Sequence, residues 1–436
     1  MVPRSSNAPS SSPRRSPRPR AALAAASLLV AVASATPSVS PVLAADPLEV
    51  RVARLTVGGE SQLPLSLLDS RIEDPGAAGA ELGLEDNLTT GGFLGHGYAL
   101  EHVTLEPAGE GAGARGIGGT TPVADPTEAA DAARSLVDAG TALLLVDLGA
   151  RALLAVADAV PEALVLNVRA PDDALRDADC RANLLHVVPS RAMLADALAQ
   201  YLAFKRWDRA ALVVGRHDED AAFADAFERA AERFGVELVE RREWTREPGA
   251  RRTDSGHLTE QSEIPTFTRL PDHDVLVAAD EGDEFGEYLA YRTEDPRPVV
   301  GTQGLVPTLW SRTHEQWGAT QIQRRFEALA DRPMTPRDQA AWLGMRAIGE
   351  AVTRTSAADP ETLRAHLLGT DFALAGFKGV PLSFRDWNGQ LRQPVLLSGE
   401  RMLVSVSPQE GYLHQFSELD TLGLDRPESA CEAFDP

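Results

Sequence analysis

Acidic side chains follow several predicted strands, at positions where they could bind a cation. Three clusters stand directly after apolar runs of the sequence: Asp172-Asp173, Asp218-Glu219-Asp220 and Asp280-Glu281. Carboxylate oxygens that converge from such loops suit a hard divalent or trivalent cation. The same side chains would equally cap the following helices and hydrate the loops. The sequence leaves both interpretations open.

Motifs of common catalytic and cofactor sites are absent from the sequence or stand in the wrong context. No G-x-S-x-G, H-E-x-x-H or C-x-x-C motif is present. Gly111, Gly113 and Gly116 satisfy G-x-G-x-x-G, but the predicted helix cap, Asp125, comes nine residues later. A dinucleotide site needs that turn to open the helix directly. We therefore expect neither an enzyme nor a cofactor site, and we interpret the glycine segment as a loop.

The N-terminus has the three parts of an export signal. Five arginines come first, an apolar run at 21–35 follows, and Val42-Leu43-Ala44 gives a small-residue cleavage pattern. The run has 15 residues, whereas a membrane span needs roughly 20. We predict a signal peptide at 1–45 and a mature protein in the periplasm, with a retained anchor as the alternative. Arg14-Arg15 leaves open whether export is general or twin-arginine.

Charge and cysteine content also constrain function. The formal net charge is −22 at pH 7, which argues against a nucleic-acid partner. Such acidity mostly serves solubility, and a cationic ligand is the alternative. The two cysteines, Cys180 and Cys431, could form a disulfide in an oxidising compartment. Two buried free thiols are the other possibility.

Strands and helices are predicted to alternate along the chain. Apolar runs typical of buried parallel strands occur at 142–146, 163–168, 210–215, 275–279 and 298–301, with strands also expected at 50–57 and 98–105. Helical patterns lie between them, for example around 74–87, after the cap at Asp125 and after Thr335-Pro336. This order predicts α/β sheets with ligands at the carboxyl ends of the strands. About 390 mature residues are too many for one core and favour two lobes.

One segment resembles a known family. The run at 180–207, with Val188-Pro189-Ser190 and Lys205-Arg206-Trp207, resembles the inter-lobe crossing of type I periplasmic solute-binding proteins of the leucine/isoleucine/valine-binding group. The stretches at 301–304 and 372–384 resemble later parts of that family. The resemblance implies two lobes, each a parallel sheet flanked by helices, joined by three hinge crossings. Lobe 1 would be 46–187 and 307–370, and lobe 2 would be 188–306 and 371–436.

Shorter stretches at 64–69, 299–310, 324–342 and 419–423 resemble a narrower branch. Its members are substrate-binding proteins found with pyrroloquinoline-quinone (PQQ)-dependent alcohol dehydrogenase systems. The resemblance implies a monomeric component of an ABC-type importer, with a small solute and an inner-membrane permease as partners. The alternative is a non-transport accessory or sensor of the dehydrogenase, which could bind a metal ion such as a lanthanide.

Candidate ligand contacts are taken from the loops that follow strands. Lobe 1 contributes Ser66, Asp69, Asp147, Gly149, Asn167, Arg169 and Asp172, and lobe 2 contributes His217, Asp280, Glu281 and Gln303. Amino-acid binders of the resembled family usually hold a carboxylate with hydroxyl groups, but the loops at 147–150 and 167–172 contain neither Ser nor Thr. Arg169 could bind a carboxylate through two hydrogen bonds instead.

Overall fold

The structure is a computed structural model that describes residues 47–59, 72–73, 75–108, 122–245 and 262–434. The predicted signal peptide, the glycine segment at 111–116 and the candidates Ser66 and Asp69 lie outside these ranges. Among the described helices, none is both long and apolar enough to cross a membrane.

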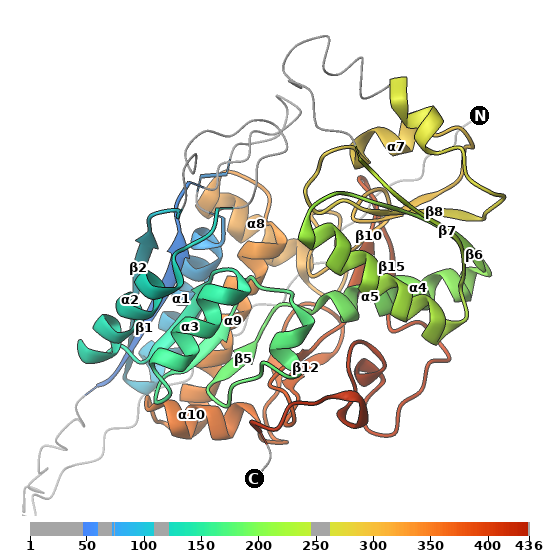
Figure 1. The fold of residues 1–436 in the computed structure, drawn as a ribbon. Coiled ribbons are helices and arrows are strands. Elements are labelled where there is room, and N and C mark those ends of the chain that lie inside the picture. The colour runs from blue at the N-terminus through green and yellow to red at the C-terminus, as the bar shows by residue number, and fades with distance from the viewer. Residues whose placement is uncertain (1–46, 60–71, 74, 109–121, 246–261, 435–436) are drawn as a thin grey trace, which may run out of the picture. The chain divides into compact units, whose positions relative to one another are not determined.

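Lobe 1 is built on a parallel sheet whose described strands run in the order β2-β1-β3-β4-β5 (Figure 1). The strands are β1 (Leu48–Val57), β2 (His96–Leu105), β3 (Leu143–Asp147), β4 (Leu164–Asn167) and β5 (Leu184–His186). The surrounding helices are α1 (Ala77–Leu94), α2 (Pro126–Asp138), α3 (Ala150–Ala159), α8 (Ala319–Ala330), α9 (Pro336–Thr355), α10 (Pro360–Leu367) and the 3₁₀ turn η1 (Asp173–Arg176).

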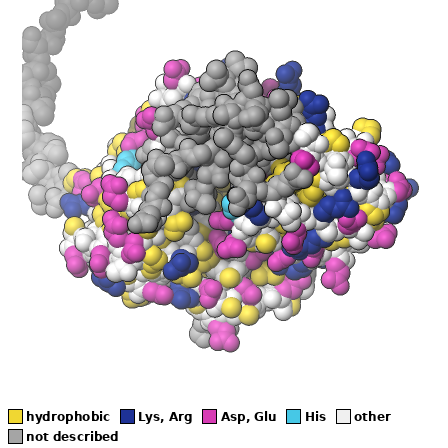
Figure 2. Space-filling model, turned by 45° about the horizontal axis from the view of Figure 1, so that its top comes forward, with side chains coloured by type: hydrophobic (Ala, Val, Ile, Leu, Met, Phe, Trp, Pro, Cys, Tyr) yellow, Lys and Arg dark blue, Asp and Glu magenta, His cyan; other side chains and the backbone are white. Residues whose placement is uncertain are grey.

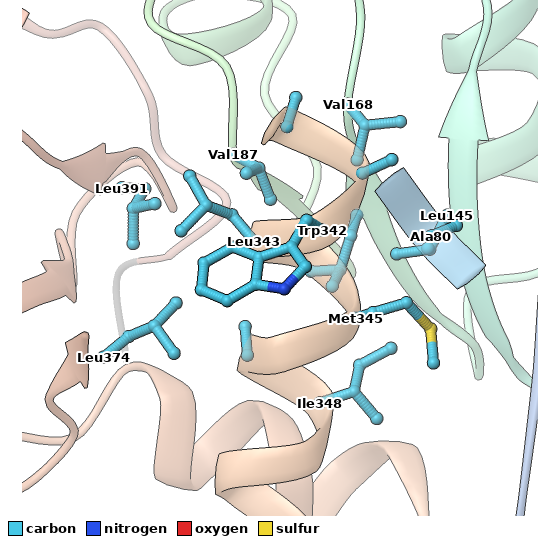
Figure 3. Packing of buried hydrophobic residues seen from close by; sticks show 14 of the residues in the cluster. Ala80, Leu145, Val168, Val187, Trp342, Leu343, Met345, Ile348, Leu374 and Leu391 are labelled. Atoms are coloured by element: carbon cyan, nitrogen blue, oxygen red, sulfur yellow. The ribbon is translucent and has the colours of Figure 1, made fainter. Parts of the chain in front are cut away.

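Both faces of this sheet are buried. Leu143 and Leu145 pack with α1 and α9 on one face, while Leu144 and Val146 pack with α2 and α3 on the other. Figure 3 shows Trp342, Leu343, Met345 and Ile348 of α9 packing in the first of these clusters. Burial on both faces explains why β3 and β4 are continuous apolar runs without alternation.

Lobe 2 has a second parallel sheet, with its described strands in the order β7-β6-β8-β9. These strands are β6 (Arg209–Val214), β7 (Glu237–Glu243), β8 (Val275–Ala279) and β9 (Val299–Gly301). Leu212 and Val277 pack with α4 (Arg191–Lys205) and α5 (Asp218–Phe234). On the other face, Val213 and Ala278 pack with Leu289 of α7 (Gly286–Arg292). The predicted α/β class with parallel sheets flanked by helices is confirmed.

Two small antiparallel sheets complete the described strands. One joins β10 (Val306–Thr308), β14 (Val395–Ser398) and β15 (Leu403–Ser407), and the other joins β11 (Leu374–Ala375), β12 (Pro381–Phe384) and β13 (Leu391–Arg392). The C-terminal part contains the 3₁₀ turns η2 (Glu418–Thr421) and η3 (Arg426–Glu428).

The core clusters suggest where the hinge crossings lie. Leu309, Leu374 and Leu391 belong to the lobe 1 cluster, whereas Val395 and Leu397 belong to the lobe 2 cluster. The lobe boundaries remain a proposal, and these clusters favour crossings near 188–190, 308–309 and 392–394. We therefore propose a third crossing about twenty residues after the predicted boundary at 370, because β11–β13 pack on lobe 1.

Two features differ from the sequence prediction. The helix expected around 74–87 begins at Ala77 and continues to Leu94, ending at Gly95 in the left-handed conformation (φ 76°). Strand β7 was not predicted, because its sequence ELVERRE is largely polar. It is an edge strand of the sheet, and an edge position permits charged side chains.

Glycines of α1 allow α9 to approach closely, which gives a stability prediction. A Cβ added at Gly79 would lie 1.9 Å from the carbonyl oxygen of Asp338. We expect Gly79→Ala to lower the free energy of unfolding by about 1–3 kcal/mol through overpacking, measured by urea unfolding. Gly92→Ala is the matched control in the same helix, because its Cβ would meet nothing within 4 Å. That change should be neutral or stabilising by up to about 1 kcal/mol. Equal losses for both variants would contradict this account.

Candidate ligand-binding cleft

A cavity of about 460 Å³ lies between the two lobes. Lobe 1 lines it with the loops after β3 and β4 and with the first turn of α9, and lobe 2 lines it with the starts of α4 and α5 and the loop after β8. Chain crossings contribute Val188 and Pro307. Its position agrees with the rule that ligands of parallel α/β sheets bind beyond the carboxyl ends of strands. A cavity of this size suits a small molecule.

A cluster of arginines forms the lobe 1 wall. Asp147, at the end of β3, is fully buried, and its Oδ2 lies 2.5 Å from Arg54 Nη2. Its Oδ1 lies 3.1 Å from Nε of Arg337, which is in the first turn of α9. The Nη1 of Arg169 donates to the Asp147 backbone carbonyl over 3.4 Å. Three guanidinium groups therefore surround the carboxylate of Asp147.

This cluster determines the charge state of Asp147. Burial raises the pKa of its carboxyl group, but the positive charges of Arg337, Arg54 and Arg169 outweigh burial and hold the pKa below its usual range. Asp147 is therefore ionised at neutral pH. Arg169 and Arg337 both line the cavity, whereas Arg54 and Asp147 do not. Two guanidinium groups of the cluster therefore lie at the cleft.

Asn167 shapes the loop that presents Arg169. Its side chain is fully buried, and its Oδ1 accepts hydrogen bonds from the backbone amides of Arg169 (3.0 Å) and Ala170 (2.8 Å). Its Nδ2 donates to the Ala170 carbonyl at 2.8 Å. Asn167 does not line the cavity, so it positions Arg169. Gly149 does line the cavity, at the N-terminus of α3, where the helix dipole adds positive potential.

The opposite wall centres on Arg191, which is only 4% exposed. Its Nε and Nη2 donate to the two carboxylate oxygens of Glu281 at 2.9 and 2.7 Å. Its Nη1 lies 3.2 Å from Asp172 Oδ1. Asp172 follows β4 of lobe 1 and Glu281 follows β8 of lobe 2, so Arg191 links both lobes. The sequence prediction named both acids but missed Arg191, although its place directly after the N-cap Ser190 of the crossing helix could have indicated it.

We expect Arg191→Met to weaken this link between the lobes. Glu281 would lose its two charged hydrogen bonds, and the free energy of unfolding should fall by about 1–3 kcal/mol, as read from urea unfolding. Arg229→Met is the control, because Arg229 also reaches lobe 1 but is 46% exposed and lies 3.4 Å from Asp173. An exposed pair of this kind should contribute less than about 1 kcal/mol. Similar losses for both variants would argue against a special role for Arg191.

The other predicted lobe 2 residues have mainly structural contacts. Asp280 is 1% exposed and accepts hydrogen bonds from the backbone amides of residues 284–286. Burial raises its pKa to about 6, although these hydrogen bonds act in the opposite direction. Gln303 Nε2 donates to Asp283 Oδ1 at 2.7 Å. Asp280 and Gln303 line a second cavity of about 460 Å³, which shares Glu281 with the first. His217 lies apart, with its Nε2 2.9 Å from Glu284.

The acidic clusters do not converge on a metal site in the part of the chain that the structure describes. No group of three or more His, Cys, Asp or Glu side chains there could hold a metal ion. Asp218, Glu219 and Asp220 instead occupy the first turn of α5, where Asp220 accepts a hydrogen bond from the His217 backbone amide. On the face in Figure 2, Asp and Glu are spread over the described surface rather than gathered in one patch. This distribution favours helix capping and solubility as the role of the acidic residues.

Comparisons with known proteins support the fold. Residues 123–247 match the family model described as periplasmic binding protein, while no curated protein matches the chain. A branched-chain amino acid ABC transporter periplasmic ligand-binding protein from Burkholderia xenovorans has a TM-score of 0.64 at 14% identity, covering 88% of this chain and 100% of that one. An ABC transporter solute-binding protein from R. palustris, solved with benzoate, gives 0.58 at 13%, covering 88% and 99%.

A third solved structure adds a further example. An ABC transporter substrate-binding protein from Desulfitobacterium hafniense, solved with Leu, has a TM-score of 0.56 at 16% identity, covering 82% of this chain and 99% of that one. All three neighbours have nearly their whole length matched. The chain therefore has the two-lobed α/β fold of periplasmic binding proteins, and residues 123–247 match the model of a periplasmic binding protein family.

Proposed function

We propose that this protein is the substrate-binding component of an ABC-type importer and that it holds a small organic carboxylate in the cleft between its lobes. The observation that carries this proposal is the arginine cluster of the lobe 1 wall. Arg169 and Arg337 line the cavity, and both lie beside the carboxylate of Asp147. Two guanidinium groups on one wall suit an anionic ligand, and arginine suits a carboxylate because its N–H groups match the two oxygens.

The remaining walls suit an apolar body. Val168, Val188, Leu194 and Leu309 line the same cavity, together with several prolines. A ligand with a charged end and a hydrocarbon or aromatic end would bury its apolar surface there. Two of the solved neighbours hold ligands of this type, benzoate and Leu. They support a carboxylate class for this protein, although the groups that hold it here are arginines.

Binding would act through closure of the lobes. A ligand that touches both walls stabilises the closed arrangement, in which a permease could recognise the protein. Nothing in this cycle changes the ligand chemically, so we propose a carrier rather than an enzyme. The signal predicted at 1–45 would place it in the periplasm, where it would work as a monomer.

The proposed link to a particular oxidation system rests on sequence resemblance alone. The stretches at 299–310, 324–342 and 419–423 resemble binding proteins of PQQ-dependent alcohol dehydrogenase systems. We propose that the importer serves such a system, so that organic acids formed by alcohol oxidation are suitable ligands. Pull-down from periplasm checks the partner: recovery of a permease complex supports the carrier, whereas recovery of the dehydrogenase alone supports the accessory role.

A paired thermal-shift screen tests the proposed ligand class. The mature protein is heated with small carboxylic acids, with their neutral amides as matched controls, and with lanthanide or calcium ions. We expect at least one acid to raise the melting temperature while its amide does not. Stabilisation by amides and acids alike would show that the arginine cluster does not recognise the ligand's carboxylate. Stabilisation by metal ions alone would favour the alternative role as a metal-binding sensor.

A further inference from the structure

The C-terminal strap, which we define as residues 418–431, contacts lobe 2 at its beginning. Its Leu422 is buried in the lobe 2 core cluster. Asp196 of α4 accepts a hydrogen bond from the Gly423 backbone amide at 2.7 Å, and Gln200 of α4 donates to Thr421 Oγ1 at 3.1 Å. This end of the strap therefore moves with α4.

The beginning of the strap is also held beside the third crossing, through Asp420. Asp420 Oδ1 accepts hydrogen bonds from Arg385 at 2.9 Å and from Arg392 at 2.8 Å. The Arg385 guanidinium also donates to the backbone carbonyls of residues 419, 422 and 424. Arg385 and Asp420 are each 1% exposed, so this contact is dry and strong. Arg392 ends β13, directly before the third crossing, where the chain leaves lobe 1 for the second time.

The far end of the strap is fixed to lobe 1. Cys431 forms a disulfide with Cys180, which follows η1. Ser429 Oγ donates to the Arg176 carbonyl at 3.2 Å. Arg176 is buried and its guanidinium donates to the Val188 carbonyl at 3.0 Å, so this anchor lies beside the first crossing. Figure 1 shows the red end of the chain running to the C-terminus.

We propose that the strap is a fourth connection between the lobes and that it limits how far the hinge opens. Only seven residues lie between the Gly423 anchor on lobe 2 and the Cys431 anchor on lobe 1. The eight steps from Gly423 to Cys431 span at most about 28 Å when the segment is fully extended, and η3 shortens it. Opening beyond the reach of the strap requires an anchor to break, and the lobe 1 anchor is covalent.

This limit would influence ligand binding without any contact to the ligand. When widely open conformations are restricted, a larger fraction of the protein is in a conformation that can close on a ligand. The apparent affinity for the ligand rises in proportion to that fraction. The inference depends on the two-lobed hinge but not on the ligand class proposed above. If no carboxylate binds in the screen, the proposed role of the strap still holds. If the strap does not limit hinge opening, the result of the carboxylate screen is not affected.

Hydrogen exchange by mass spectrometry on the ligand-free protein tests the strap. Two variants break it at opposite ends: Cys180→Ser combined with Cys431→Ser at lobe 1, and Asp196→Ala at lobe 2. Reduction of the disulfide in the unaltered protein provides a third way. We expect all three to accelerate exchange at least tenfold in the crossings at 187–190 and 391–395, with a smaller change in β3 and β8. The radius of gyration from small-angle scattering should rise as well.

Asp359→Ala is the matched control, because it removes the N-cap of α10, whose side chain accepts a hydrogen bond from the Thr362 amide. This variant lowers stability away from the strap and should leave the rate of hydrogen exchange in the crossings unchanged relative to the rest of the protein. The proposal is overturned if the strap variants speed exchange uniformly, as the control would, or if the radius of gyration stays unchanged. In that case the disulfide only stabilises the fold.

Discussion

Asp147→Asn should destabilise the protein by about 3–5 kcal/mol, the range found when one partner of a buried ion pair is removed. The variant keeps the shape of the side chain but removes the negative charge that lies among Arg54, Arg169 and Arg337. Arg54 is fully buried, and loss of its ion pair with Asp147 would remove electrostatic stabilisation of its charge inside the protein. Mutual repulsion of the guanidinium groups adds to this loss.

Urea unfolding at neutral pH measures the effect. Asp131→Asn is the control, since Asp131 pairs with Arg134 on the surface, with side chains 68% and 54% exposed. That change should stay below about 1 kcal/mol. The pKa of Asp147 is held below its usual range, so its contribution is present above the unfolded-state pKa and is lost as the pH falls through the folded-state value. The difference between the unaltered protein and Asp147→Asn should therefore shrink in strong acid. A loss no larger than the control's would mean that the cluster is not held by this carboxylate.

Arg169→Met should weaken binding of the carboxylate found in the screen by about 30-fold or more, the effect of removing one partner of a buried charge pair. Methionine preserves much of the apolar stem while removing the guanidinium group that faces the cavity. Arg337→Met should act in the same direction, because Arg337 lines the same wall. It should also cost some stability through its contact with Asp147.

Isothermal titration with that carboxylate measures both variants. Arg151→Met is the control, since Arg151 is an exposed arginine of α3 beside the cleft but does not line the cavity. Its affinity should match that of the unaltered protein at physiological salt. If Arg169→Met and Arg151→Met bind equally well, the carboxylate is held elsewhere.

The sequence was sufficient to predict the layers of the fold. Strands β3, β4, β6 and β8 are buried on both faces, and such strands leave continuous apolar runs that can be recognised without a structure. The starts of α2 and α9 could also be predicted from the local sequence, because each has a capping residue followed by proline. Edge strand β7 was missed because its side chains are mostly in contact with solvent.

The site could be predicted only in part. Asp147 and Arg169 could be proposed from the sequence because they follow apolar strands, and the structure places both in the arginine cluster. Arg54 lies inside strand β1 and Arg337 lies in a helix 168 residues beyond Arg169, so only tertiary packing brings them together. Asn167 was expected to contact ligand, but a side chain that fixes its own loop gives the same sequence pattern. The Cys180–Cys431 pairing was favoured from composition and compartment, and the structure contains it.

A crystal structure with the carboxylate that gives the largest thermal shift tests the central claim most directly. We expect the ligand in the cavity between the lobes, with its carboxylate hydrogen-bonded to Arg169 and Arg337 and its apolar part against Val188 and Leu194. A ligand bound outside this cavity, or one whose carboxylate has no contact with either arginine, would contradict the account.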